Sequence, residues 1–467
     1  MRWYHHLTSS QRRILSGLAA GVILVLGLLG WSVWRTLRVS PLSSPPVTPV
    51  TPQVSTATVT PSPTPTPTET PTPVPTFSVA DAGNIADRVA EARNVLPRWG
   101  TPLTLVTEHE MTTMLYQHYQ TYPPLVLQLQ MPLKALRLWF WEEAQTDPRA
   151  QAQNTAAIYL PQSEELYLQR AWDGANEVLD AQLAYGYARA IPDQYGDLPR
   201  LLAEAATLDR KLALSAVADG DALVALYLYS GVEPGSEEAQ TLAETVKRAS
   251  LPYWKSKDLL LTDLSQLTLM MGNDFATYQY AHGGTAALDE AILRPPRSTE
   301  QILHPERYAS NEPPAALTPV DVDLGKDWDL YYEDTLGEAL LRLVILEWSE
   351  GKLPADSVTE WGGDLLQIWL GPDEQDVVAL HLAWDSNRMA GLFYGKMLEL
   401  LPGPLAIGRE TQEPPTQALP NGRWWAGTQG AAFLRRGGDR VYIVWGSDSV
   451  AVEKVSIALG AIGNNTP

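Results

Sequence analysis

The sequence contains no cysteine among its 467 residues. Disulfide bonds, thiolate zinc sites, a cysteine nucleophile and a lipid-modified cysteine are therefore excluded. Positive charge is scarce as well, because 34 lysines and arginines stand against 54 acidic residues and leave a formal net charge of −20. No run rich in lysine or arginine interrupts this balance. Such a surface repels phosphate backbones, so we expect no nucleic-acid partner.

The sequence also lacks the short motifs of several large enzyme classes. It has no G-x-S-x-G, no Walker motif and no dinucleotide-binding glycine pattern. Serine hydrolase, nucleotide-binding and Rossmann functions therefore have no support, and we expect no cofactor.

One long hydrophobic segment lies near the N-terminus. Residues 14–34 form 21 positions without a charge, which span roughly 30 Å as a helix, the thickness of one hydrocarbon layer. Arginines are slightly more frequent before this segment than after it, which favours a cytoplasmic tail at residues 1–13. We therefore expect a single-pass protein of the cell membrane, anchored by this helix, with the bulk of the chain extracytoplasmic.

The next segment, residues 35–76, is dominated by proline and threonine. Between positions 41 and 76 there are 12 prolines and 11 threonines, and almost no side chain that can enter a core. Such a composition favours an extended polyproline II conformation, which reaches up to ~110 Å over this length. We interpret it as a disordered extracytoplasmic stalk of the cell envelope.

Globular composition begins near residue 77 and continues to the C-terminus. Apolar residues spaced three and four apart predict helices at 79–95, 201–230, 334–349 and 386–401. Residues 377–384 and a pair of strands around the Gly437-Gly438 turn predict a small C-terminal sheet, followed by a helix at 450–459. The fold class is thus mainly α (α+β), with a helical domain at 77–355 and a small α+β unit at 356–467.

Within the first domain, a hairpin precedes the most informative helix. Strands at 157–160 and 165–169 flank a Pro-Gln-Ser turn, and a helix follows from about Asn176. We expect this helix to end at Pro192, because proline removes a hydrogen bond from a helix interior. The helix contains the stretch LAYGYARAIPDQYGDL, residues 183–198, and a second box, DGDA, follows at 219–222.

This order of elements resembles a family of membrane-anchored bacterial zincin-like (gluzincin-type) metallopeptidases. In that family the helix has the form L-A-H-E-Y-x-H-A-L-Q-D-Q-x-x-D-L and the later box the form A-L-x-E-G-D-A. The similarity extends through PPRSTEQILHPERY (295–308), EDTLGE (333–338) and WGGD (361–364). The resemblance implies a zincin-like fold for the helical domain with its small hairpin.

The resemblance also implies where the chemistry would lie. Two histidines of an H-E-x-x-H helix bind zinc, and the glutamate between them takes a proton from the metal-bound water. Position by position, the first histidine corresponds to Tyr185, the glutamate to Gly186, the second histidine to Arg189 and a third ligand to Asp219. Tyrosine is a poor zinc ligand, glycine cannot act as a base, and arginine places a permanent cation at the metal position. The resemblance therefore indicates a pseudoenzyme without catalytic residues or metal.

Two further expectations follow from the resemblance. Arg189 would form an ion pair with Asp219 across the former metal site and replace zinc as a cross-link. Tyr187, Asp193, Asp197 and Asp221 become candidate residues of a retained substrate cleft. We expect the chain to bind a peptide or protein ligand at the cell surface without cleaving it.

Three other interpretations of the sequence remain open. The helix at 183–191 also fits an ordinary amphipathic core helix without any functional history. The chain is alternatively an active zinc metallopeptidase with an atypical site, which would bind zinc through other residues. It is alternatively a structural or glycan-binding protein of the cell envelope, because exposed tryptophans among Trp139, Trp141, Trp424 and Trp425 could stack on sugars.

Overall fold

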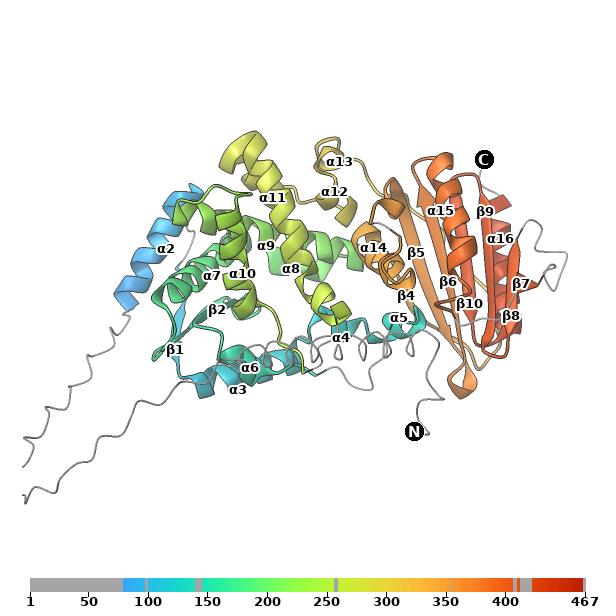
Figure 1. Cartoon of the computed structure of the whole chain (residues 1–467), viewed down its shortest axis with the longest axis horizontal. Coiled ribbons are helices and arrows are strands. Elements are labelled where there is room, and N and C mark those ends of the chain that lie inside the picture. Colours follow the sequence, from blue (N-terminus) through green and yellow to red (C-terminus); the bar gives the residue numbers. More distant parts are fainter. Residues whose placement is uncertain are drawn as a thin grey trace, which may run out of the picture. The chain divides into compact units, whose positions relative to one another are not determined.

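A helical part and an antiparallel sheet make up the computed structural model of this chain (Figure 1). The structure describes residues 79–96, 100–138, 145–255, 259–353, 355–405, 410–411 and 422–464. All of these belong to one compact unit, Pro73–Pro467. The predicted tail, membrane helix and stalk (1–13, 14–34 and 35–76) lie outside the described residues, as do Trp139 and Trp141.

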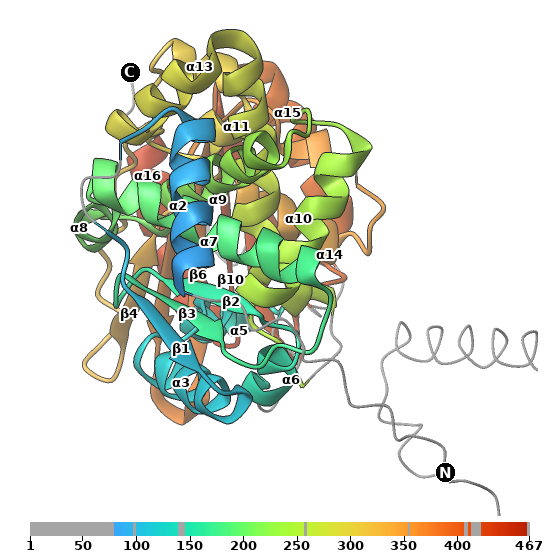
Figure 2. The same ribbon diagram turned by 90° about the vertical axis from the view of Figure 1, so that its left-hand side faces the viewer.

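The helical part is assembled around two long helices, α9 (Leu208–Ser230) and α11 (Leu259–Leu293), with α7 (Asn176–Gly196) against α9. Figure 2 shows α2 (Val79–Arg93) lying across α7 and α9, and the structure places it in contact with both. The remaining helices are α3 (Glu108–Thr121), α4 (Leu125–Gln128), α5 (Gln130–Ala135), α6 (Pro148–Ala152), α8 (Leu198–Glu204), α10 (Glu237–Ser250), α12 (Thr299–Leu303) and α13 (Pro305–Ala309).

Helix α9 satisfies the length and hydropathy of a membrane-spanning helix, and it is the one helix among the described residues that does so. However, 83% of its most apolar window is buried inside the protein. Its apolar surface is therefore explained by the surrounding helices of the core.

The helical part also contains a three-stranded sheet with the order β1-β3-β2. Strands β2 (Ala157–Leu160) and β3 (Glu165–Gln169) form the predicted hairpin with the predicted bounds. Strand β1 (Leu103–Val106) pairs parallel to β3, so β2 is left at the edge of the sheet.

The C-terminal sheet has seven antiparallel strands in the order β4-β5-β6-β10-β9-β8-β7. The strands are β4 (Asp329–Asp334), β5 (Trp361–Leu370), β6 (Asp376–Trp384), β7 (Glu410–Thr411), β8 (Arg423–Gly427), β9 (Gly430–Gly437) and β10 (Arg440–Gly446). The sheet thus takes its first strand from a segment ahead of residue 356, where we expected the C-terminal unit to begin. Short 3-10 turns lie at Ala355–Val358 and Pro372–Glu374.

Both faces of the large sheet are buried, so its strands are apolar at successive positions. Val378, Leu380 and Leu382 of β6 face the core that contains α14 (Gly337–Trp348) and α15 (Asn387–Leu400). Val377 and Ala379 face α16 (Ser449–Asn464) on the opposite side. These helices lie alongside the strands in Figure 1.

The helical part and the sheet share hydrogen bonds from two buried tryptophans. Trp348 Nε1 donates to the Leu136 carbonyl at 2.8 Å, and Trp445 Nε1 donates to the Ala135 carbonyl at 2.9 Å. The two indole rings meet edge to face. The end of α5 is thereby attached to both α14 and β10. The mixed α+β class with a C-terminal sheet is confirmed.

Most predicted helices and strands are confirmed, but the predicted helix at 201–230 is divided into α8 and α9, and the predicted end of α7 is wrong. The helix passes through Pro192 and ends at Gly196. Proline removes only one backbone hydrogen bond, and the residues after it are buried in the core. Asp193 accepts a hydrogen bond from the Tyr159 hydroxyl at 2.6 Å, and Gln194 is 4% exposed. These tertiary contacts hold the last turn of the helix.

Candidate functional site

A cavity of about 650 Å³ lies beside α7 and extends from α3 to the first third of α11. Its wall includes edge strand β2, the first half of α9 and the segment that follows α10. Four of its lining residues are Tyr185, Gly186, Arg189 and Asp219. The structure therefore brings together all four positions that the resemblance assigns to the metal and the base.

Arg189 and Asp219 form the expected ion pair. Arg189 Nη1 lies 3.4 Å from Asp219 Oδ1, and the two side chains are 16% and 15% exposed. Burial disfavours the charged guanidinium, but Asp219 together with Tyr185, Asp193 and Tyr159 outweighs this effect, so the pKa of Arg189 is raised. The cation is therefore permanent at any accessible pH.

Tyr185 and Gly186 occupy the same stretch of α7 beneath the hairpin. Tyr185 is 5% exposed, and its burial raises the pKa of the hydroxyl, so the side chain is neutral. A Cβ atom added at Gly186 would lie 2.4 Å from Leu166 Cδ1. The fully buried Leu166 side chain thus occupies the space into which a glutamate at position 186 would extend.

Asp193 lies one turn beyond Arg189 but does not line the cavity. Its Oδ2 accepts from the Tyr159 hydroxyl, while its buried Oδ1 has no hydrogen-bond partner. Burial raises the pKa of Asp193, and Arg189 opposes this shift. Asp193 therefore joins α7 to β2 behind the cavity wall.

The other three cleft candidates do not line the cavity, contrary to the expectation from the resemblance. Tyr187 faces the core formed by the hairpin and α9. Asp197 lies at the surface in a left-handed conformation (φ +52°) after α7, and it pairs with Arg200 at 2.6 Å. Asp221 is 1% exposed and forms an ion pair with the fully buried Arg93 of α2.

The DGDA box is explained largely by packing. A Cβ atom at Gly220 would lie 2.0 Å from the Gly272 carbonyl oxygen, because α9 and α11 cross there in backbone contact. Asp221 attaches α2 through Arg93. Only Asp219 of the box's two carboxylates lines the cavity.

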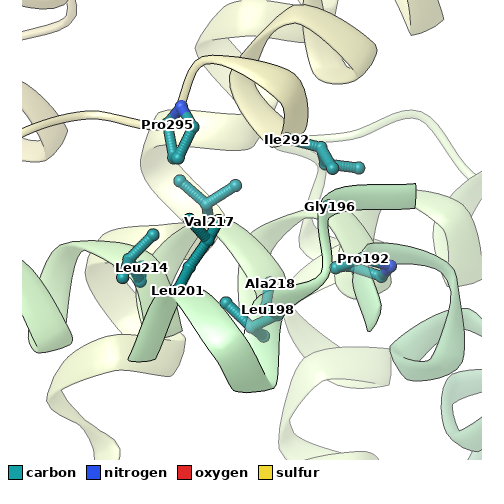
Figure 3. A pocket seen from close by; sticks show the side chains of 9 residues that line it. All are labelled: Pro192, Gly196, Leu198, Leu201, Leu214, Val217, Ala218, Ile292 and Pro295. Atoms are coloured by element: carbon teal, nitrogen blue, oxygen red, sulfur yellow. The ribbon is translucent and has the colours of Figure 1, made fainter. Parts of the chain in front are cut away.

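A second, much smaller gap of about 10 Å³ lies beyond Pro192, at the C-terminal end of α7 (Figure 3). The labelled residues that surround it are apolar and come from α7, α8, α9, α11 and the loop after α11. Its volume is that of one water molecule at most, and no polar side chain lines it. It is a packing defect of the helical core.

Comparisons with known proteins cover only the C-terminal sheet. A family model described as a domain of unknown function (DUF8575) matches residues 329–456. This region runs from β4 into α16 and does not include the cavity. No curated protein and no solved structure matches the chain.

The three downstream stretches of the resemblance meet in a second cluster, which the sequence did not predict. Its four buried carboxyl groups belong to Asp209, Glu300, Glu338 and Asp364, each at most 3% exposed. They come from the start of α9, from α12, from α14 and from β5. The clustering joins the helical part to the first strands of the large sheet.

Each carboxylate of this cluster has specific partners. Asp209 Oδ1 accepts from the Thr299 backbone N–H at 2.8 Å and from its hydroxyl at 2.5 Å. Asp364 accepts from the backbone N–H groups of Leu336 and Gly337 at 2.8 and 2.9 Å. Burial is the main cause that raises the pKa of Asp209 to about 6 and that of Asp364 to about 7.

Glu338 and Glu300 complete this cluster. Glu338 Oε1 contacts His304 Nε2 at 3.0 Å and Arg342 Nη2 at 2.5 Å. Burial raises the pKa of Glu300 to about 8, although Arg307 opposes the shift. Within the part of the chain that the structure describes, no group of three or more possible ligands could hold a metal ion, here or in the cavity. The cluster is therefore best explained as a structural junction.

Proposed function

We propose that this chain is a catalytically degenerate relative of the zincin-like metallopeptidases that binds peptide or protein chains without cleaving them. The observation that carries this proposal is the Arg189–Asp219 ion pair, at 3.4 Å in the wall of the cavity. A guanidinium cannot release a proton to make room for a metal ion. The pair thus occupies the place that the resemblance assigns to zinc.

The cavity supports binding as the remaining activity. Its volume of about 650 Å³ falls within the usual range of ligand sites, roughly 300–1,000 Å³. Tyrosines, prolines and leucines line it together with serine, threonine and glutamine side chains. A mixed lining of this kind suits a peptide, which presents both apolar side chains and backbone hydrogen-bonding groups.

Edge strand β2 offers backbone groups to such a peptide. Leu166, the partner of Tyr159 in the hairpin, donates its backbone N–H to Pro102 on the opposite side of β3. Tyr159 and Leu166 therefore form a non-hydrogen-bonded pair, and the backbone N–H and C=O of Tyr159 face the edge of β2 that pairs with no described strand, where Gln182 already accepts from the Ala157 N–H. An extended peptide that lies along β2 can pair with these groups as an added strand.

The location of this activity is part of the same proposal. Residues 14–34 would anchor the chain in the cell membrane, and residues 35–76 would hold the described unit away from the bilayer on the extracytoplasmic side. The high proline and threonine content of the second segment supports this arrangement.

The two alternative functions have less support. An atypical zinc peptidase requires at least three ligands, and the described residues offer no such group. Glycan stacking requires exposed aromatic rings, whereas Trp424 and Trp425 are 5% and 2% exposed. The described tryptophans of the sugar-binding hypothesis therefore belong to the core.

The zinc content of the full chain tests the degenerate site. The purified chain is incubated with zinc, desalted and analysed by elemental mass spectrometry, and we expect a value near zero. About one zinc per chain would mean that other residues bind the metal, and the proposal of a degenerate site would be abandoned.

Peptide binding is tested with a variant that fills the cavity. Thr268 of α11 lines the cavity, whereas Thr241 of α10 lies on the exposed surface. Binding is followed by the change in fluorescence anisotropy of labelled hexapeptides when the chain is added. We expect Thr268→Trp to abolish this change and Thr241→Trp to leave it as in the original chain. Equal binding by both variants would contradict peptide binding in this cavity.

A further inference from the structure

The guanidinium of Arg189 has more hydrogen-bond donors than partners. It carries five N–H donors, and its ion pair within the described residues is the 3.4 Å approach to Asp219 Oδ1. Its Nη1 atom is buried and makes no hydrogen bond. Buried donors without partners are unfavourable by themselves, so the site gains when an acceptor reaches them.

The charges around the cavity also favour an anionic ligand. Arg189 and Lys211 line it, and Asp219 is the one carboxylate among its described lining residues. The cavity is therefore locally cationic within a chain whose formal net charge is −20. Carboxylates fit a guanidinium well, because two N–H groups can donate to the two oxygens in parallel.

Strand β2 and Arg189 are close enough to act on the same ligand. Tyr159, whose backbone faces the open edge of β2, donates its hydroxyl to Asp193. Asp193 lies one helical turn after Arg189 on α7. Residues of β2 and Arg189 also line the same cavity, so a peptide paired with β2 would lie in the cavity that contains Arg189.

We propose that the ligand of this cavity is a peptide that carries a carboxylate, and that Arg189 pairs with this carboxylate while β2 pairs with the peptide backbone. The inference rests on the proposed peptide-binding function and specifies its ligand. The carboxylate is either the C-terminus of the peptide or an acidic side chain, and both present the same two oxygens. Lys211 adds a second positive charge to the same cavity.

The test uses the full chain and three pools of hexapeptides, labelled at the N-terminus and randomised over uncharged residues. The first pool ends in a free carboxylate, the second in a carboxamide, and the third in a carboxamide with glutamate at the third position. We expect the Kd of at least one carboxylate pool to be about tenfold or more below that of the neutral pool. The pool with the lower Kd identifies the source of the carboxylate.

Two substitutions, Arg189→Gln and Asp219→Asn, test whether the difference in Kd arises at this site, and Arg200→Gln is the control. Arg189→Gln should abolish the difference between pools, whereas Arg200→Gln, on exposed α8 outside the cavity, should preserve it. Asp219→Asn removes the competing carboxylate and should increase the preference for carboxylate peptides. Asp219→Asn leaves Arg189 in place, so it tests the inference even where Arg189→Gln does not fold.

The outcomes separate the two proposals. Equal Kd values for the carboxylate and neutral pools would overturn the role of Arg189 and leave peptide binding intact. A preference that persists in Arg189→Gln, or that weakens in Asp219→Asn, would also overturn it. The absence of binding by every pool would instead contradict the proposed function itself.

Discussion

Arg93 and Asp221 form an ion pair that is almost completely shielded from water. Arg93 Nε and Nη2 donate to Asp221 Oδ1 at 2.9 and 2.8 Å, and the two side chains are 0% and 2% exposed. The pair attaches α2 to the middle of α9, and Asp289 of α11 adds a second carboxylate 2.9 Å from Arg93. A residue that the sequence suggested for a cleft is thereby an anchor of the helical core.

Replacing Arg93 with methionine should strongly destabilise the protein. The substitution leaves the buried carboxylate of Asp221 without its cation, and such losses usually amount to about 3–5 kcal/mol. Urea unfolding of the full chain measures the change, with the exposed Arg200→Met as the matched control. An equal effect of the two substitutions would show that the buried pair does not hold α2 in place.

The crossing of α9 and α11 predicts opposite effects for two glycine substitutions. Gly220→Ala places a Cβ atom 2.0 Å from the Gly272 carbonyl oxygen, so the helices must separate and Tm should fall markedly. Gly83→Ala, in α2, meets no atom within 4 Å and should stabilise the chain by up to about 1 kcal/mol. Thermal unfolding followed by circular dichroism distinguishes the two, and a stable Gly220→Ala variant would contradict the close crossing.

Introducing the zinc ligands that the resemblance assigns to α7 tests the geometry of the proposed site. Positions 185 and 189 are one turn apart on α7, and Asp219 already approaches position 189. The double variant Tyr185→His, Arg189→His should therefore retain about one zinc per chain after desalting, with one coordination position open. Tyr185→His combined with Arg189→Gln is the control and should retain none.

Failure of the double variant would be informative provided that its circular dichroism spectrum matches that of the original chain. It would mean that α7 and α9 do not hold the three side chains at ligand distances, and the resemblance to zincin-like peptidases would lose its physical basis. Peptide cleavage is not expected even when zinc binds, because Gly186 has no side chain that could act as the base.

The stability of the chain should decrease as the pH rises from about 5 to 8. Glu300 has a folded-state pKa of about 8, above the ordinary value of about 4.3, so the folded state binds a proton that the unfolded state has lost. The stabilisation is complete below the unfolded pKa and is lost as the pH rises through the folded pKa. Asp209, with a pKa of about 6, acts in the same direction over the lower part of this range.

The substitution Glu300→Gln tests how much Glu300 contributes to this pH dependence of stability. Arg307 lies 3.7 Å from Glu300 and 2.6 Å from both Glu312 and Asp385, so its charge is shared among three carboxylates. Glu300→Gln should reduce the pH slope of the unfolding free energy by on the order of 1 kcal/mol per pH unit between pH 5 and 8. The exposed Glu306→Gln is the control, and equal slopes in both variants would contradict the assignment.

Local patterns predicted most of the secondary structure. The hairpin at 157–169 has the expected bounds, and α15 and the Gly437-Gly438 turn lie where propensity and turn residues placed them. The end of α7 was missed, because contacts of the buried Asp193 and Gln194 outweigh the preference of Pro192. Strand β1 was missed for a similar reason, since a four-residue strand is stabilised by its parallel partner β3 rather than by its own sequence.

The sequence by itself determined which chemistry positions 185, 186 and 189 cannot supply, because tyrosine is a poor zinc ligand, glycine has no side chain to act as a base and arginine is a permanent cation, whatever the fold. Tertiary structure alone decided which acidic residues face the cavity. Asp219 and Asp221 are two residues apart on one helix, yet one lines the cavity and the other anchors α2. The rotation of α9 in the core sets this difference, and it depends on partners such as Arg93 and Gly272 that lie far away in the chain.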